Sequence, residues 1–438
     1  MKKVITVIGL GNLGLPYSLL LAEAGYKVHG YDVDSTLCQQ LKRKTYFGTE
    51  RGVQSLLKQV RSFHIVSTLE EAITDSDIIF ICVPTMTTEE GAYDHTLLWS
   101  VINDISKYLS RNKLVVIKSN IMPGTMNTIK FELEEKSKLT CGVNFNVYYS
   151  PDFAGLGEMV HSLANPDFIL IGELNHHSQD IEEVELSIVK NNARAIHTSF
   201  ENAELARLFI GNFLTVKMSY GNMMSEFCEK ISGADIEVVS RIMEKDHRIG
   251  SQFINGGLSY GGPYLGKDND ALKYLSKKLL FKENWMIKAA EDINNLNEDR
   301  VMNNLREIMA GSFKDKNVAV LGLSYKPGTP SVYRSGAVLL VLKLLNEKAI
   351  VSVHDPQSLN AAKSILGDTV VYCSNIKDCL NNTDLCIIAV PWDEYKYLTQ
   401  EDFVKSMRTP IVYDCWRILK NHTAGKTFGV FLALGRKA

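Results

Sequence analysis

The chain has 438 residues, a net charge of −2 at pH 7, 45% hydrophobic residues and 22% charged residues. These values are ordinary for a globular enzyme of two or three domains, and they exclude the strongly basic surface that nucleic-acid binding requires. The sequence also lacks the run of about 18 apolar residues that a membrane-spanning helix needs, and it opens on a strand pattern rather than a secretory leader.

The first third of the chain alternates short β-rich runs with helical patterns. Apolar residues recur at spacings of three and four in segments such as Pro16–Ala24 and Leu97–Leu109. This alternation predicts a parallel sheet with helices on both faces. The predicted strands are Val4–Ile8, Lys27–Tyr31, His64–Ser67, Ile78–Val83, Leu114–Lys118, Asn146–Tyr149 and Phe168–Ile171.

The segment from about residue 200 to 310 has a different character. Glu201–Ser232 contains no proline, its only glycines are Gly211 and Gly221, and its apolar residues follow a helical spacing. This pattern predicts a helix of about 30 residues, roughly 45 Å long, that joins two halves of the chain. Its apolar stripe suits a dimer interface, with burial inside one subunit as the alternative.

A second alternating block follows the helical segment. Its predicted strands are Val318–Leu323, Ile350–His354, Thr369–Tyr372, Asp384–Ala389 and Pro410–Tyr413. We therefore expect an α/β protein with two Rossmann-like, doubly wound parallel-sheet domains, bridged by a long central helix and a helical dimerisation segment. The expected domains are residues 1–199, 200–312 and 313–438.

A glycine-rich turn follows the first predicted strand, in the order Gly9-Leu-Gly11-Asn-Leu-Gly14. In a dinucleotide-binding turn, such glycines allow a tight turn, a close approach to the pyrophosphate and helix–strand packing. Asp32 ends the second predicted strand, where a carboxylate binds the adenosine ribose and repels a 2′-phosphate. These features favour NAD as the cofactor, whereas the alternative is a turn that needs its glycines only for packing.

The second block repeats the strand–glycine opening at Gly322 but lacks the other glycines of the turn. We therefore expect a nucleotide diphosphate there rather than a second NAD. The eight cysteines have no Cys-x-x-Cys spacing, and several lie in apolar runs, which indicates reduced thiols in the cytoplasm and no structural metal. His176 and His177 lie in a polar stretch that we interpret as a solvated loop rather than a metal site.

Several motifs in a fixed order resemble those of the UDP-glucose/GDP-mannose dehydrogenase family, from residue 1 to about 420. The resemblance implies an NAD domain, a helical dimerisation domain and a nucleotide-sugar domain, and hence a homodimer. Such enzymes oxidise a sugar C6 alcohol twice with NAD, through an aldehyde, to a uronic acid. The motifs are Gly9–Pro16, Ile81-Cys-Val-Pro84-Thr85, Asn165-Pro-Asp167, Ala203-Glu-Leu205, Asp246-His-Arg248-Ile-Gly250, Tyr260-Gly-Gly-Pro-Tyr-Leu-Gly-Lys267-Asp268, Leu321-Gly-Leu-Ser-Tyr-Lys326-Pro-Gly-Thr329, His354-Asp-Pro356 and Trp392-Asp-Glu.

The resemblance and the glycine turn together give a set of candidate site residues. For the cofactor they are Gly9, Gly11, Asn12, Leu13, Gly14, Asp32, Val83, Pro84, Thr85 and Ser119. For the substrate they are Tyr260, Gly261, Lys326 and Arg248, which in the family reaches the sugar nucleotide of the neighbouring subunit. For catalysis they are Lys267, Asp268, Tyr264, Asn120, Asp152 and Arg207.

The chain departs from the family pattern where the covalent chemistry takes place. Tyr264 stands where the family has the cysteine whose thiolate attacks the aldehyde, and a phenol, with an unperturbed pKa near 10, is a poor substitute. No cysteine lies nearby in the sequence to replace it. The other changed positions are Asn120 for threonine, Asp152 for glutamate, Leu156 for a second glutamate, Arg207 for lysine, Gly211 for asparagine, Tyr333 for arginine, and Asp414-Cys-Trp-Arg417 for Asp-Gly-Arg-Asn.

Three functions remain compatible with these departures. The first is a dehydrogenase limited to one hydride transfer, in which Tyr264 beside Lys267 acts as the base or merely fills the old site. The second is a redox-neutral epimerase that retains its cofactor. The third is a non-catalytic protein that binds NAD and a nucleotide sugar and regulates an active paralogue through the shared helical interface.

Overall fold

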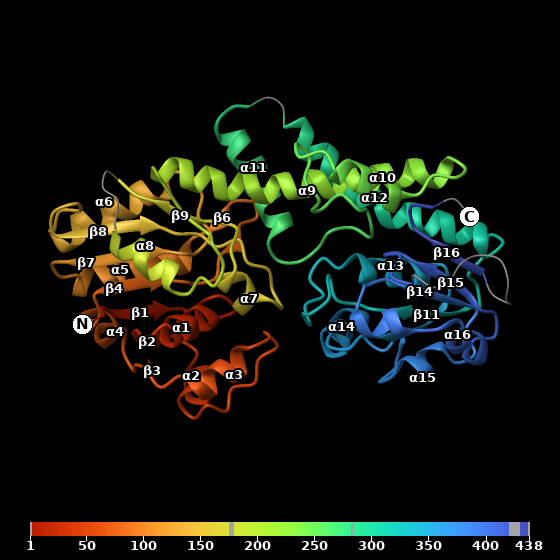
Figure 1. Ribbon diagram of the computed structural model, residues 1–438, viewed down its shortest axis with the longest axis horizontal. Coiled ribbons are helices and arrows are strands. Elements are labelled where there is room, and N and C mark those ends of the chain that lie inside the picture. Colours follow the sequence, from red (N-terminus) through yellow and green to blue (C-terminus); the bar gives the residue numbers. More distant parts are fainter. Residues whose placement is uncertain (1, 175–178, 282–283, 420–429, 437–438) are drawn as a thin grey trace. The chain divides into compact units, whose positions relative to one another are not determined.

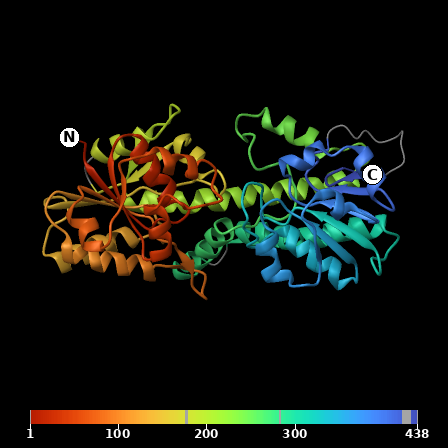
Figure 2. The same cartoon turned by 90° about the horizontal axis from the view of Figure 1, so that it is seen from below.

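A computed structural model describes residues 2–174, 179–281, 284–419 and 430–436 (Figures 1 and 2). His176 and His177 lie outside the described residues. The chain divides into two compact units, Met1–Ile210 and Gly211–Ala438, which we call unit 1 and unit 2.

Unit 1 contains an eight-stranded sheet in the order β10-β9-β8-β7-β4-β1-β2-β3, with helices on both of its faces (Figure 1). All neighbouring strands are parallel except β8 and β9. Strands β4 and β7 are buried along their whole length, as expected for central strands covered on both faces. The strands are β1 (Val4–Ile8), β2 (Lys27–Tyr31), β3 (Phe63–Ile65), β4 (Ile78–Ile81), β7 (Lys113–Ile117), β8 (Phe145–Tyr149), β9 (Ile169–Gly172) and β10 (Ala195–Thr198).

The connections of unit 1 are helical, apart from a short hairpin of β5 (Met86–Thr87) and β6 (Tyr93–Asp94). The carboxyl ends of β1, β4, β7 and β8 meet at one edge of the sheet because these four strands are parallel neighbours. The helices are α1 (Gly14–Glu23), α2 (Ser35–Lys42), α3 (Val53–Gln59), α4 (Leu69–Thr74), α5 (Thr96–Tyr108), α6 (Thr125–Ser137), α7 (Met159–Ala164) and α8 (Gln179–Ser187).

Unit 2 contains a six-stranded, wholly parallel sheet in the order β13-β12-β11-β14-β15-β16. The strand order reverses between β11 and β14, as in a doubly wound sheet. The two parallel sheets and the long helices confirm the predicted fold class. The elements are β11 (Asn317–Leu321), α13 (Gly336–Asn346), β12 (Ile350–His354), α14 (Leu359–Leu366), β13 (Val371–Tyr372), α15 (Ile376–Leu380), β14 (Leu385–Ile388), a 3-10 helix (Asp393–Tyr397), α16 (Gln400–Ser406), β15 (Ile411–Asp414) and β16 (Val430–Ala433).

The predicted long helix is α9 (Phe200–Lys230), which begins in unit 1 and ends in unit 2. Its 31 residues run without a break through both glycines. A Cβ atom at Gly211 would overlap the carboxylate of Asp268, and one at Gly221 would lie 2.9 Å from the backbone of Ile254. Both glycines are therefore required by close packing. Unit 2 also contains α10 (Ile236–Glu244), α11 (Leu265–Lys278) and α12 (Trp285–Ile308).

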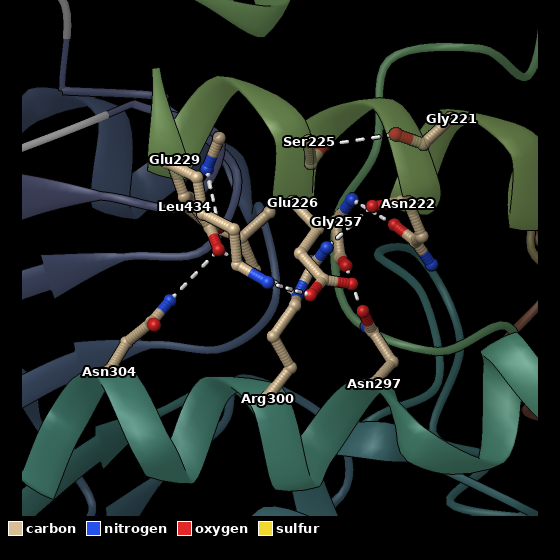
Figure 3. Close-up of polar contacts among 12 residues, drawn as sticks. Gly221, Asn222, Ser225, Glu226, Glu229, Gly257, Asn297, Arg300, Asn304 and Leu434 are labelled. Atoms are coloured by element: carbon tan, nitrogen blue, oxygen red, sulfur yellow. Dashed lines mark hydrogen bonds and ion pairs between the residues drawn. The ribbon is translucent and has the colours of Figure 1, made fainter. Parts of the chain in front are cut away.

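Polar side chains connect α9 and α12 and hold the loop that leads to α11 (Figure 3). Gly257 of this loop donates its N–H to Asn222 Oδ1 at 2.8 Å and accepts from Asn297 Nδ2 at 2.8 Å. Glu229 accepts from Asn304 Nδ2 at 3.1 Å. Within unit 2, side chains of α9 and α12 therefore hold the start of the loop that precedes α11.

None of the helices in the described residues is long and apolar enough to cross a membrane.

Candidate nucleotide and catalytic sites

The glycine turn after β1 shows which of its glycines serve packing. A Cβ at Gly9, where φ is +90°, would lie 2.8 Å from the carbonyl oxygen of Cys82, and a Cβ at Gly14 would overlap the carbonyl of Gly9. A Cβ at Gly11 would meet no atom within 4 Å. Packing does not require Gly11, so its bare backbone suits the close approach of a ligand such as the NAD pyrophosphate.

Asp32 is held against the glycine turn by two hydrogen bonds. Its Oδ2 accepts from the N–H of Leu10 at 2.7 Å, and its Oδ1 accepts from the N–H of Asp34 at 2.9 Å. Gly9 donates its own N–H to the carbonyl of Tyr31, next to Asp32, at 2.8 Å. The carboxylate is thus fixed at the ligand side of the turn, where it would accept from the ribose hydroxyls of NAD. Asn12 is exposed and Leu13 half-buried on the same turn.

Replacing Asp32 with asparagine is expected to weaken NAD binding by about tenfold and to shift the preference towards NADP. Asparagine has the same shape as aspartate but no charge, so the variant offers the ribose one charge-assisted hydrogen bond fewer. Asp34→Asn is the matched control because Asp34 only caps α2 and asparagine caps equally well. Calorimetric titration with both dinucleotides measures the ratio. An unchanged ratio in Asp32→Asn would contradict the assigned role.

The loops after β4 and β7 are tied together at the same edge. Ser119 donates its hydroxyl to the carbonyl of Val83 at 2.8 Å, and Thr85 donates to the carbonyl of Asn120 at 2.9 Å. Pro84 lies exposed between them. The structure therefore brings together four of the residues predicted to bind the cofactor (Val83, Pro84, Thr85 and Ser119) and Asn120.

A buried lysine beside these loops was missed by the sequence analysis. The Lys118 ammonium lies 2.8 Å from Glu185 Oε1 and 3.2 Å from Asp152 Oδ2, and it donates to the carbonyl of Ser150 at 3.1 Å. The Ser150 hydroxyl donates to Glu185 Oε1 at 2.6 Å. We call Lys118, Asp152 and Glu185 the lysine–carboxylate cluster. The available signal was a lysine directly after the apolar run Leu114–Ile117, because only a partner stabilises a charge buried with such a run.

Burial and charge act in opposite directions within the cluster. Burial raises the pKa of Asp152, Lys118 lowers it, and the negative charge of Glu185 raises it further. Burial acts to lower the pKa of Lys118, but Asp152 and Glu185 outweigh it and raise that pKa. Arg207 is also buried, lies 5.6 Å from the ring centroid of Phe153 and adds positive charge near Asp152.

In unit 2, Tyr264 directly precedes α11, and Lys267 and Asp268 lie in its first turn. The Asp268 carboxylate is buried against Gly211, in the space that a side chain at position 211 would need. The Arg334 guanidinium packs against Gly266 and lies 3.2 Å from Asp270 Oδ2.

Burial lowers the pKa of Lys267, and the neighbouring Arg334 guanidinium lowers it further. Arg334 directly follows Tyr333, the position at which the resemblance predicts an arginine.

The remaining substrate candidates also lie in unit 2. Tyr260 is held by Asn294 at its N–H (2.8 Å) and by Asn269 at its hydroxyl (3.1 Å), and burial raises its pKa to about 12. A Cβ at Gly261 would overlap a backbone carbonyl. Arg248 is exposed and paired with its near neighbour Asp246, and Lys326 is half-buried after β11.

The second Rossmann-like sheet repeats the geometry of the glycine turn, but protein donors occupy the carboxylate of its aspartate, Asp355. The N–H of Gly322 donates to the backbone carbonyl of His354 at 2.7 Å, just as the N–H of Gly9 donates to the carbonyl of Tyr31 in unit 1. Asp355 Oδ2, however, accepts from the N–H of Leu323 at 2.8 Å and from the Trp392 indole at 3.1 Å. Both carboxylates accept from protein donors, but Asp355 is buried whereas Asp32 is partly exposed.

Comparison with known proteins agrees with this arrangement over the whole chain. The NAD binding, central and UDP binding domains of the UDP-glucose/GDP-mannose dehydrogenase family match residues 3–196, 201–296 and 319–421. The UDP-glucose 6-dehydrogenase of Rickettsia felis is 30% identical, over 99% of this chain and 96% of the relative. The chain belongs to the UDP-glucose/GDP-mannose dehydrogenase family.

Two solved structures of the family resemble the whole chain. The UDP-glucose dehydrogenase of Pyrobaculum islandicum has a TM-score of 0.85 and 26% identity, covering 100% of this chain and 98% of that one. The UDP-D-ManNAc dehydrogenase of Pyrococcus horikoshii has a TM-score of 0.84 and 25% identity, covering 99% of both chains. The predicted family membership and NAD-binding domain are therefore confirmed, whereas the roles of individual residues stay predictions.

No group of three or more metal-ligating side chains is found among the described residues.

Proposed function

We propose that this chain is an NAD-dependent oxidoreductase that removes one hydride from a CH–OH group of a nucleotide sugar and omits the second oxidation. The observation that carries the proposal is the contrast between an intact cofactor turn and a changed catalytic position. Gly11 is uncovered and Asp32 is fixed beside it. The resemblance of residues 260–268 to the family motif predicts that Tyr264 stands at the position of the family's cysteine. Residues 229–372 contain no cysteine, so no thiol near Tyr264 in the sequence replaces it.

The cofactor, when bound, supplies the hydride acceptor. Gly9, Gly11, Gly14 and Asp32 would hold its adenosine and pyrophosphate, and the tied loops at Val83–Thr85 and Ser119 would hold its nicotinamide half. Two groups could accept the proton of the carbinol: Tyr264, three residues before Lys267 in unit 2, and Asp152 in unit 1. Lys267, Asp268, Arg248, Tyr260, Gly261 and Lys326 are proposed to bind or orient the sugar nucleotide.

We further propose a homodimer and the three-domain division at residues 199 and 312. Phe213, Tyr220 and Phe227 are exposed on α9 at intervals of seven residues and therefore share one face of the helix. Val238 and Ile242 on α10 are exposed as well. Large exposed apolar side chains at such spacing are typical of a contact with a second copy.

The first test is the amount of NADH formed per nucleotide sugar, read by absorbance, with the product mass measured in parallel. The panel contains UDP-, GDP- and N-acetylated sugar nucleotides. We expect one NADH per sugar and the mass of an aldehyde or ketone. Two NADH and an acid would show that Tyr264 does not block the second oxidation.

Tyr264→Cys is expected to raise the yield from one NADH per sugar towards two, with an acid product. The new thiolate can form the thiohemiacetal that the second hydride transfer requires. Tyr264→Ser is the matched control, because its smaller side chain opens the same space with a much weaker nucleophile and should stay at one NADH. Equal yields in both variants would contradict the role assigned to the missing thiol.

A binding protein without turnover is the second candidate. The observation in its favour is Asp268, which is almost fully buried against Gly211 in unit 2. Calorimetrically confirmed binding of NAD without NADH formation from any sugar nucleotide of the panel would favour this candidate or the redox-neutral epimerase.

A further inference from the structure

The lysine–carboxylate cluster has an inner and an outer part. The side chains of Lys118 and Glu185 are 1% and 4% exposed, whereas that of Asp152 is 20% exposed. The hydroxyl of Ser150 donates a hydrogen bond to Glu185, the inner carboxylate. Only Asp152 among the three is therefore open to a ligand, and the other two lie behind it.

The cluster lies at the edge of the sheet where the cofactor loops lie. Lys118 directly precedes Ser119, and Asp152 follows the carboxyl end of β8, the parallel neighbour of β7. The Lys118 ammonium also lies 4.5 Å from the ring centroid of Tyr17, three residues after Gly14. All of these residues belong to unit 1, so the arrangement depends on unit 1 alone.

A cavity of about 230 Å³ adjoins the cluster. Its lining includes Lys118, Ser150, Asp152, Asn165 and Glu185. A cavity of this size with several polar groups can hold water, which offers a route by which a proton leaves a buried carboxylate.

We propose that Asp152 accepts the carbinol proton and that Lys118 and Glu185 are the positioning residues that set its charge. The inference rests on the proposed function. Oxidation of a CH–OH group breaks its C–H and O–H bonds and forms a C=O bond. The hydride passes to NAD⁺ to give NADH, and the proton passes to the Asp152 carboxylate and then to water in the cavity.

The charge of the cluster explains why three groups are needed. One ammonium and two carboxylates carry a net charge of −1, so the pair of carboxylates can take up one proton without leaving an unpaired positive charge. Without Glu185, Lys118 would hold Asp152 in a one-to-one ion pair and make it a weaker base. The titratable and charged groups around Asp152 and Lys118 are Tyr17 on α1, Cys82 after β4, Glu185 on α8 and Arg207 on α9. His161 and Asp167 line the same cavity.

The test is the pH dependence of kcat in four variants. Lys118→Met removes the ammonium between the two carboxylates and leaves only the positive charge of Arg207 near Asp152, so the acidic limb of this variant should move to higher pH by about one unit or more. Glu185→Gln removes a negative charge, so its acidic limb should move to lower pH. Lys118→Arg should stay near the wild type. KM for the sugar nucleotide and the NAD affinity should change less than about threefold, since none of these side chains binds the ligands directly.

Lys113→Met is the matched control. Lys113 is a second buried lysine, at the first position of β7, the strand that Lys118 directly follows. Its ammonium donates to the carbonyls of Ile73 and Thr74 at 2.8 and 2.7 Å and has no carboxylate partner in its hydrogen bonds. Its removal should lower the thermal stability without moving the acidic limb. If Lys118→Met and Glu185→Gln both turn over and the acidic limb of their kcat–pH profiles does not move, the inference is overturned.

A second measurement needs no turnover. Infrared difference spectra at neutral pH should show the carbonyl stretch of a protonated carboxyl group in Lys118→Met but not in the wild type. The band should disappear in the triple variant Lys118→Met/Asp152→Asn/Glu185→Gln, which keeps no carboxyl group of the cluster. If the wild type forms no NADH, the proposed function is contradicted, but the infrared spectra still show whether Lys118 keeps the carboxylates ionised. Absence of the carbonyl band in Lys118→Met would overturn the inference.

Discussion

Gly14→Ala is expected to destabilise unit 1 by about 3 kcal/mol and to abolish NAD binding. The added Cβ would overlap the carbonyl oxygen of Gly9 and would lie 3.1 Å from the Cβ of Cys82. Both neighbours belong to the crossing of β1, β4 and α1, where backbone cannot move without breaking sheet hydrogen bonds. Calorimetric unfolding, with and without NAD, would show an earlier transition that NAD no longer shifts.

Gly11→Ala separates the packing role of the turn from its ligand role. Because no atom lies within 4 Å of the added Cβ, the melting temperature of the free protein should stay within about 2 °C of the wild type. The same methyl group would occupy the space needed by the pyrophosphate, so NAD affinity should fall by about tenfold or more. If Gly11→Ala lowered the melting temperature of the free protein as much as Gly14→Ala, the turn would serve packing only.

Asp355→Ala is expected to destabilise unit 2 by at least about 3 kcal/mol. The Asp355 carboxylate accepts from the N–H groups of Leu323 and Ser324 through Oδ2, and from those of Gln357 and Ser358 through Oδ1. Removing it leaves several buried donors without an acceptor, each of which costs about 1–3 kcal/mol. Denaturant unfolding followed by tryptophan fluorescence would measure the loss.

Asp368→Ala is the control for the loss of an aspartate. Asp368 is 90% exposed, and its nearest cation, Lys363, lies 3.4 Å away. Exposed ion pairs contribute little, so the stability should change by less than about 0.5 kcal/mol. A comparable effect of both substitutions would show that the hydrogen bonds of Asp355 are replaced by solvent.

The central strands could be predicted from the sequence because burial on both faces leaves an unbroken apolar run. Ile78–Ile81 and Lys113–Ile117 coincide with predicted strands for this reason. Two edge strands were missed. Ala195–Thr198 has no fully buried residue and thus no apolar run to detect. Val430–Ala433 is apolar but only four residues long, and a short apolar run does not by itself distinguish a strand from another buried segment.

The cofactor turn could be predicted because its requirements are local: three glycines and an acid within two adjacent strands. The lysine–carboxylate cluster could not, because Lys118 and Glu185 are 67 residues apart and meet only through the packing of α8. Glu185 sits in a helical pattern with other acidic residues, so nothing local distinguishes it as buried. The same holds for Arg334, whose guanidinium reaches Gly266 only in the folded unit.

The position of β16 has a consequence for synthesis on the ribosome. β16 pairs only with β15, and the residues that follow it bind the central helices, through the Gly435 N–H to Glu229 at 2.8 Å. While residues 430–436 are still unsynthesised, β15 (Ile411–Asp414) has an open edge that can pair with a neighbouring nascent chain. Unit 1 can complete its sheet much earlier, so aggregation during translation should depend mainly on the last stage of unit 2.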